Sequence, residues 1–455
     1  MAATVFDSAI FRDSFAAPAM RSIFSEAETV ARYVEVEVAL AQVEGRLGLI
    51  PQEAADGIKR LASAEAIDLD QLRRATNVVG YPIVGLVAQL AKQCGEAGRY
   101  LHWGATTQDI MDTAVALQLK AALALVDADL AVIAATLAAL AERHRGTVMA
   151  GRTHLQHALP ITFGYKAAVW LGPIVRHRQR LAELRPRVLV GQFAGAAGTL
   201  ASLGDKGLAV HDQLMAELAL GTSAMPWHVA RDGVAETVCL LALIAGSLAK
   251  IATDVMLLMQ TEVGEAFEPF EEGRGSSSTM PQKRNPISCE LIIAAAKIVR
   301  QHAGLMLDAV AADQERATGP WHLEWLALPE AFLASSAALA HSRSMLDGLV
   351  VAPERMRHNL ELSGGLIVAE AVMMALAERT GRQEAHHIVG SAARAALAKG
   401  TPLLSELERD ARVTQHLDAE RLRQLTDPGN YLGSAPAMVD RMLALTRGRL
   451  EPRRV

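Results

Sequence analysis

A polar stretch late in the chain combines residue types that can take a proton from carbon and hold the resulting negative charge. It reads Gly273-Arg-Gly-Ser-Ser-Ser-Thr-Met-Pro-Gln-Lys-Arg-Asn-Pro286. Glycine and serine favour a mobile loop, and a helix is expected to begin near its last proline. Hydroxyls, the Lys283 ammonium group and the Asn285 amide could converge on a substrate carboxylate there, because free backbone N–H groups at a helix start also favour anions. A surface linker is the plainer interpretation, but such linkers rarely place Met-Pro between a serine run and Lys-x-Asn.

Two earlier polar segments carry further candidate groups. Leu101-His-Trp-Gly-Ala-Thr-Thr-Gln-Asp-Ile-Met-Asp-Thr113 stands before a long helical pattern, so its hydroxyls could cap that helix or bind an anion. Gly151-Arg-Thr-His-Leu-Gln-His-Ala-Leu-Pro160 contains histidines that could be structural or could transfer protons. Each segment alone supports both a structural and a catalytic interpretation.

Long helical patterns must position these segments. From Asp112 to about Arg145 the chain has no glycine or proline, and its apolar residues recur on more than one helix face. Similar patterns follow at about 160–185, 229–264, 287–312 and 323–348. A helix that is apolar on several sides must be surrounded by others, so the sequence predicts a central bundle that also packs against other subunits.

Composition supports packed helices throughout. Hydrophobic residues make up 51% of the 455 residues but aromatics only 4%, so alanine, leucine, valine and isoleucine dominate. Shorter helical patterns flank the bundle, with starts expected at Ser25 and Pro51. The predicted fold class is all-α with three helical domains, at residues 1–110, 111–355 and 356–455, and the polar loop 273–286 lies in the second.

Several function classes are disfavoured. The net charge is −5 and no basic cluster suits nucleic acid, apart from arginines at the chain's end. The first residues lack the pattern of a signal peptide, and the most apolar run, 238–249, looks too short to cross a bilayer. Three scattered cysteines suit a reducing compartment, so we expect a cytoplasmic protein. His386 and His387 would point apart on a helix, so no metal site is expected.

The stretch from Ser276 to Asn285 resembles the signature loop of the fumarase/aspartase superfamily, Gly-Ser-Ser-x-Met-Pro-x-Lys-x-Asn. By spacing to the lysine, the resemblance implies that Ser277 is the catalytic base. It also implies that Lys283 and Asn285 hold the substrate carboxylate and its enolate-like intermediate. Ser276 stands where the family usually has glycine, which leaves open which serine acts.

The two earlier segments resemble the family's first and second conserved regions, in the right order. The resemblance therefore implies a fumarase/aspartase-like fold, a small dicarboxylate or tricarboxylate substrate, no cofactor and a homotetramer whose sites collect residues from different subunits. Arg316 is a further candidate for a carboxylate clamp, although it could equally be a surface or intersubunit arginine. The other residues that this likeness places at the substrate are Thr106, Thr107, Gln108, Thr153, Gln156, Ser278 and Met280.

Whole-chain likeness is greatest to bacterial 3-carboxy-cis,cis-muconate cycloisomerases, but two site residues point elsewhere. Eliminating members of the superfamily pair a histidine in the second region with a glutamate five residues after the signature asparagine. This chain has both, as His154 and Glu290. A glutamate beside an imidazole raises the pKa of the histidine, which suits proton delivery to a leaving group. Resemblance to adenylosuccinate lyases is weaker, because residues 75–82 lack that branch's histidine.

The predicted activity is therefore β-elimination from a 2-substituted succinate, with C–N or C–O cleavage and release of fumarate or a close relative. The alternative is 3-carboxy-cis,cis-muconate cycloisomerase, favoured by overall likeness. A superfamily member kept as an inactive structural protein is a third hypothesis. It would be expected to have lost Ser277, Lys283 or His154, and all three are present.

Overall fold

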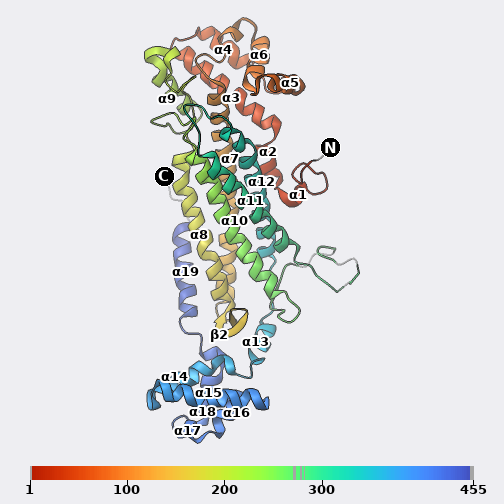
Figure 1. Ribbon diagram of the computed structural model, residues 1–455, viewed down its shortest axis with the longest axis vertical. Helices are drawn as coiled ribbons and strands as arrows, with labels where there is room; N and C mark the ends of the chain where they lie inside the picture. The colour runs from red at the N-terminus through yellow and green to blue at the C-terminus, as the bar shows by residue number, and fades with distance from the viewer. Residues whose placement is uncertain (1–2, 270–272, 277–278, 281, 451–455) are drawn as a thin grey trace. The chain divides into compact units, whose positions relative to one another are not determined.

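The computed structural model describes residues 3–269, 273–276, 279–280 and 282–450. Helices dominate this part of the chain, and the strands are short, so the predicted all-α class is confirmed. All five long helical patterns are present as helices (Figure 1). They are α7 (Thr107–Arg143), α8 (Phe163–Val188), α10 (Asp232–Leu258), α11 (Ile287–Ala309) and α12 (Pro320–Asp347).

Contacts divide the chain into two compact units that do not follow chain order. The first unit combines Met1–Asp129, His177–Ala249 and Leu291–Ala340. The second combines Leu130–Arg176, Lys250–Glu290 and His341–Val455. Each long helix contributes residues to both units. The three domains predicted in chain order stay a prediction beside this division.

The first unit adds shorter helices around its share of the long ones. Helix α3 begins after Ser25, whose side chain accepts a hydrogen bond from the backbone N–H of Glu28, and α4 begins after Pro51. Both predicted helix starts are therefore confirmed. The shorter helices of this unit are α1 (Arg12–Phe15), α2 (Pro18–Ile23), α3 (Glu26–Arg46), α4 (Gln52–Leu61), α5 (Leu69–Val79), α6 (Ile83–Cys94), η1 (Gly95–Tyr100), η2 (Ala201–Lys206) and α9 (Gly207–Glu217).

The second unit contains the short strands and the helices near the end of the chain. Strands β1 (Val148–Thr153) and β2 (Gln156–Thr162) form an antiparallel hairpin, and β3 (Ala266–Phe267) pairs with β4 (Val350–Val351). The remaining helices are α13 (Pro353–Glu361), η3 (Leu366–Val368), α14 (Ala369–Thr380), α15 (Arg382–Lys399), α16 (Leu403–Arg409), α17 (Ala411–Thr414), α18 (Ala419–Thr426), η4 (Pro428–Asn430) and α19 (Ala435–Leu450).

Two helices of the described residues, α7 and α10, are long and apolar enough to cross a membrane by length and composition alone, and a bent pair formed by α13 with 366–380 could count as a third. The expectation that no apolar run has sufficient length is therefore wrong. That expectation considered only the uninterrupted apolar run 238–249, whereas a membrane-spanning helix tolerates a few polar residues. Within the chain, 39% of the most apolar window of α7 and 56% of that of α10 are buried.

A buried charge cluster fastens three long helices of the first unit. The guanidinium group of Arg231, just before α10, donates to Asp112 on α7 at 2.9 and 3.0 Å and to Glu324 on α12 at 2.7 Å. These three side chains are at most 5% exposed. Two carboxylates and one guanidinium group can tolerate this burial only because they pair with one another.

Replacing Arg231 by methionine should therefore destabilise the first unit strongly. Two buried carboxylates would lose their shared cation, and losing one partner of a buried ion pair typically costs about 3–5 kcal/mol. We expect a large drop in the free energy of unfolding, measured by urea denaturation. Arg187→Met is the matched control, since the Arg187–Glu236 pair is about half exposed, and should change stability little. Equal effects of the two substitutions would contradict this account of the cluster.

Candidate active site

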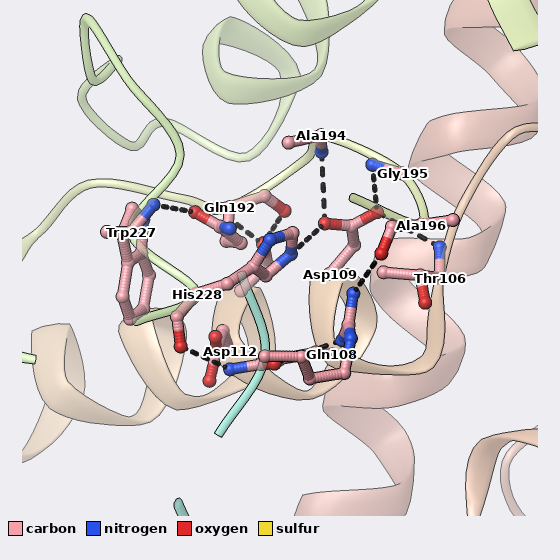
Figure 2. A network of polar contacts seen from close by, with 12 residues as sticks. Thr106, Gln108, Asp109, Asp112, Gln192, Ala194, Gly195, Ala196, Trp227 and His228 are labelled. Atoms are coloured by element: carbon pink, nitrogen blue, oxygen red, sulfur yellow. Dashed lines mark hydrogen bonds and ion pairs between the residues drawn. The ribbon is translucent and has the colours of Figure 1, made fainter. Parts of the chain in front are cut away.

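The first conserved region lies at the start of α7, where the Asp109 carboxylate gathers four donors (Figure 2). It accepts hydrogen bonds from the backbone N–H groups of Thr106, Ala194 and Gly195 at 3.0, 3.0 and 2.9 Å. The fourth contact is with Nε2 of His228 at 2.8 Å, and both side chains are at most 2% exposed. Asp109 thus joins the first region to the loop at 192–196.

Gln108 and Arg316, both predicted to bind substrate, contact each other. Nη1 of Arg316 donates to Oε1 of Gln108 at 3.0 Å, and its Nη2 donates to the backbone oxygen of Ala196 at 2.8 Å. The amide nitrogen of Gln108 donates to the backbone oxygen of His228 at 2.9 Å. The oxygen and the nitrogen of the buried Gln108 amide thus both have hydrogen-bond partners. To bind a substrate carboxylate, as predicted, Gln108 would have to give up one of these hydrogen bonds.

The hydroxyls of Thr106 and Thr107, unlike the amide of Gln108, are not already engaged within the part of the chain that the structure describes. Both residues are half-buried. Among the described residues, no hydrogen bond engages either hydroxyl, so both can donate to a bound anion. Thr107 is the first residue of α7, where backbone N–H groups also favour negative charge. The structure therefore keeps these two side chains available for the predicted carboxylate.

The second conserved region is a β-hairpin in the second unit, which the sequence did not predict. Thr153 pairs with Gln156, so His154 and Leu155 form a two-residue turn with φ of 52° and 63°. Such turns normally use Asn-Gly, because a side chain at positive φ costs roughly 1–2 kcal/mol. Thr153, His154, Leu155 and Gln156 are all exposed. Strain of this kind concentrates at functional sites, and here it presents the predicted proton donor at a hairpin tip.

A buried ion pair supports this hairpin. Arg152 donates from both terminal nitrogens to Glu265, at 2.8 and 2.7 Å, and Asn359 donates to the same carboxylate at 2.7 Å. Glu265 has no exposed surface. A two-point contact of a guanidinium group with a carboxylate is rigid as well as strong. It therefore fixes the backbone one residue before Thr153 and two before His154.

The signature loop is closed at its base. The backbone N–H of Asn285 donates to the oxygen of Gly275 at 2.9 Å, and Ser276 forms a β-bridge with Arg284. Gly275 has φ of 68°, and a Cβ atom there would lie 2.7 Å from the Asn285 backbone oxygen. Only glycine fits this close approach. Ser277 and Ser278, the predicted base and its neighbour, lie outside the described residues.

The start of α11 differs from expectation. The Glu268 carboxylate accepts hydrogen bonds from the backbone N–H groups of Ser288 and Cys289, at 3.1 and 2.8 Å. This chain's own carboxylate therefore fills the position where the sequence predicted a substrate anion at the helix start. Glu268 lies about 20 residues before the N–H groups that it caps. Capping rules based on neighbouring residues therefore do not predict it.

The remaining predicted residues differ in their exposure. Lys283 and Glu290 are exposed, Met280 is 43% exposed and Asn285 is half-buried. Within the part of the chain that the structure describes, no hydrogen bond or ion pair joins His154 to Glu290. The predicted pairing of these two side chains, which the resemblance places in different subunits, stays a prediction.

The sequence missed a partly buried contact within the first region, between Nδ1 of His102 and Oε1 of Glu37 at 2.6 Å. Burial lowers the pKa of His102, but the hydrogen bond with Glu37 and the charges of Glu37 and Asp109 outweigh it, so the pKa is raised overall. His102 also has φ of 59°. It is quoted in the first region, yet no spacing rule links it to a glutamate 65 positions earlier.

Glu37 also affects a second buried acid on α3. Burial, and then the negative charge of Glu37, raises the pKa of Glu44 to about 9. Neither oxygen of the Glu44 carboxyl has a hydrogen-bond partner among the described residues. The raised pKa favours a neutral Glu44 carboxyl group at neutral pH, close to the Glu37 carboxyl group that contacts His102.

Curated relatives cover nearly the whole chain. Trans-aconitate decarboxylase 1 of Mycosarcoma maydis is 48% identical over 95% of this chain and 88% of its own length. The 3-carboxy-cis,cis-muconate cycloisomerase of Pseudomonas aeruginosa is 46% identical over 96% of each chain. The N-acetyl-S-(2-succino)cysteine lyase of Dickeya dadantii is 40% identical over 98% of this chain and 99% of its own.

Solved structures agree with these relatives. The fumarate lyase from Mesorhizobium sp. BNC1 is 55% identical and matches with a TM-score of 0.89 over 94% of this chain and 98% of its own. The 3-carboxy-cis,cis-muconate lactonizing enzyme from Pseudomonas putida is 43% identical, with a TM-score of 0.94 over 97% of this chain and all of its own.

Family models complete the assignment. The model described as "Lyase" matches residues 12–300, and "Adenylosuccinate lyase C-terminus" matches residues 365–442. Together with the all-α fold, these matches define a lyase-type enzyme. The chain belongs to the fumarase/aspartase superfamily of lyases.

Replacing Glu37 by glutamine should destabilise the protein in a pH-dependent way. The His102–Glu37 contact contributes fully below the ordinary histidine pKa of about 6.5 and is lost as pH rises through the raised pKa of His102. The substitution also removes the charge that opposes ionisation of Glu44, a benefit that grows with pH. We expect a deficit of about 1–3 kcal/mol at pH 6 that shrinks by pH 9.

Urea unfolding at pH 6 and pH 9 measures this difference. Glu26→Gln, an exposed position on the same helix α3, serves as the control and should show little change at either pH. A Glu37→Gln deficit of the same size at both pH values would contradict the assigned protonation of His102 and Glu44.

Proposed function

We propose that this enzyme eliminates a substituent from a 2-substituted succinate, by C–N or C–O cleavage, and releases fumarate or a fumarate-like product. The observation that carries the proposal is that His154 stands exposed at a strained hairpin tip while Glu290 stands exposed on the first turn of α11. Brought together between subunits, the Glu290 carboxylate would accept a hydrogen bond from the imidazole of His154 and orient it. That pairing suits proton delivery to a departing amine or oxygen group.

The first half of the reaction is removal of a proton from the carbon beside a carboxylate. Such a C–H is a very weak acid, so the developing negative charge must be stabilised. Ser277 would take the proton, with Lys283 and Asn285 close to it in sequence to stabilise the charge. Thr106 and Thr107, whose hydroxyls are available, would bind the carboxylate. No metal or cofactor is needed for these steps.

The exposure of the predicted catalytic side chains supports an active site that is completed by other subunits. His154, Lys283 and Glu290 all face solvent in the single chain, and water weakens the electrostatic interactions that the reaction requires. Other copies of the chain would cover these groups and exclude water. We therefore propose a cytoplasmic homotetramer with sites shared between subunits, as the resemblance implies.

The alternative function is 3-carboxy-cis,cis-muconate cycloisomerase. The curated and structural relatives support it as well as they support elimination, since cycloisomerases match at 46% identity and with a TM-score of 0.94. Proton transfer at the carbon beside a carboxylate would be common to both reactions, because elimination removes a proton there and lactone formation adds one. They differ at the leaving group, because forming a lactone releases no amine that needs a proton.

A substrate panel distinguishes the functions. Purified protein would be mixed with aspartate, N-substituted aspartates, S-(2-succinyl) thiols and nitrosuccinate, and fumarate formation followed by absorbance. Loss of 3-carboxy-cis,cis-muconate absorbance tests the cycloisomerase, and trans-aconitate tests the reaction named for the relative from Mycosarcoma maydis. Fumarate release from any 2-substituted succinate supports the proposal, and turnover of carboxymuconate alone refutes it.

Replacing Glu290 by glutamine should affect leaving groups unequally. An amine must be protonated as it departs, so its elimination should slow by about 10²–10⁴-fold, as for loss of a general acid. Nitrite leaves as a stable anion and should be affected far less. The measurement is kcat for an N-substituted aspartate and for nitrosuccinate. Asp308→Asn, exposed on the same helix, is the control; an equal loss for both substrates would argue against a proton-delivery role.

Replacing Ser277 by alanine should abolish turnover of whichever substrate is active, by about 10²–10⁴-fold in kcat, because no other base would take the carbon-bound proton. Ser276→Ala is the matched control. Its hydroxyl donates to the backbone oxygen of Gly273 at 3.0 Å, so its loss should alter kcat much less. If Ser276→Ala were the inactive variant, the assignment of the base by spacing to Lys283 would be wrong.

A further inference from the structure

Four aromatic rings gather in the first unit of a chain that is only 4% aromatic. Tyr81, in the turn between α5 and α6, stacks on Trp321 at the start of α12, with ring centroids 5.7 Å apart. Trp325 lies one helical turn beyond Trp321 and meets it edge-on at 5.1 Å. His322 completes the cluster at 4.5 Å from Trp325. Such contacts hold each ring in a defined orientation.

The aromatic cluster is anchored next to the first conserved region. The indole N–H of Trp321 donates to Asp112 at 3.2 Å. Asp112 lies one turn after Gln108 on α7, so the two side chains project from the same helix face. Arg316, which donates to Gln108 at 3.0 Å, precedes Trp321 by five residues. The same short segment thus joins the predicted carboxylate-binding residues to the cluster.

Only one member of the cluster is deeply buried. Trp321 is 5% exposed, whereas Trp325 is 38% exposed, His322 is exposed and Tyr81 is half-buried. Aromatic rings held open to solvent beside a binding region offer dispersion contacts and a π face to a ligand. The Asp112 carboxylate beneath them is already paired with Arg231. The cluster therefore suits a hydrocarbon group better than an anionic one.

We propose that Tyr81, His322 and Trp325 bind the substituent of the 2-substituted succinate and select for a flat or bulky hydrocarbon body. This inference rests on the proposed function for the succinate part of the substrate. Thr106 and Thr107 bind a carboxylate at the start of α7, and the substituent extends along the α12 side toward the rings. The preferred leaving group is then an alkyl or aryl amine or thiol, rather than ammonia or nitrite.

Binding of two unreactive ligands tests the cluster without requiring turnover. 2-Benzylsuccinate and 2-methylsuccinate both carry a substituent joined through carbon, so neither can eliminate. We expect the wild-type protein to bind 2-benzylsuccinate at least about tenfold more tightly by calorimetry, since burying a ring typically contributes more than the 1.4 kcal/mol that a tenfold change represents. Trp325→Ala should bring the two affinities to within about threefold and leave that for 2-methylsuccinate unchanged.

Two further variants keep the test decisive. Tyr81→Ala should reduce the preference in the same direction, which covers the case that Trp325→Ala fails to fold. Leu208→Ala removes an apolar side chain that is 74% exposed on α9 and should leave the preference intact. Equal affinities for the two ligands in the wild type, no binding of 2-benzylsuccinate, or an unchanged preference in both cluster variants would overturn the inference.

The outcomes separate this inference from the proposed function. If no 2-substituted succinate releases fumarate but the benzyl preference depends on Trp325, the elimination chemistry is wrong and the binding role of the rings stands. If fumarate is released and the preference does not depend on the cluster, elimination stands and the rings have another role.

Discussion

The organisation of the first unit depends on carboxylates buried in the first turns of α7. Asp109 and Asp112 are three residues apart and both are 1% exposed, so each must find partners inside the protein. Asp109 takes backbone donors from the loop at 192–196, and Asp112 pairs with Arg231 beside α10. Satisfying these two charges brings distant segments to the same helix end, where the hydroxyls of Thr106 and Thr107 remain available.

In the second unit, the candidate catalytic side chains that the structure describes are exposed and not buried. Its hairpin holds His154 at positive φ in a turn whose residues are exposed. The pairing of Arg152 with the buried Glu265 fixes the hairpin base and offsets that strain. Glu268 caps α11 in a similar way and holds the residues around Glu290. Buried carboxylates thus support exposed catalytic candidates in the second unit.

The names of the relatives describe different reactions, a decarboxylation, a cycloisomerisation and the cleavage of a succinylated cysteine. In the proposed elimination a proton leaves the carbon beside a carboxylate, and in lactone formation a proton is added there, so one charge-stabilising site could serve both reactions. What divides them is the group on the neighbouring carbon. In our proposals, His154 and Glu290 act on the protonation of that group, whereas Tyr81, His322 and Trp325 select its shape. Selectivity in this chain is therefore expected to depend partly on residues outside the three conserved regions.

Local sequence determined the long helices, two of the shorter helix starts and the superfamily, because helix periodicity, caps and a motif such as 276–285 are encoded by neighbouring residues. Tertiary structure decided what no spacing shows. It tied Gln108 to Arg316, filled the start of α11 with Glu268, and paired His102 with Glu37. The hairpin at His154 escaped prediction because His-Leu lacks the usual Asn-Gly signal. Such contacts join residues far apart in the chain, and only folding decides which buried charge meets which partner.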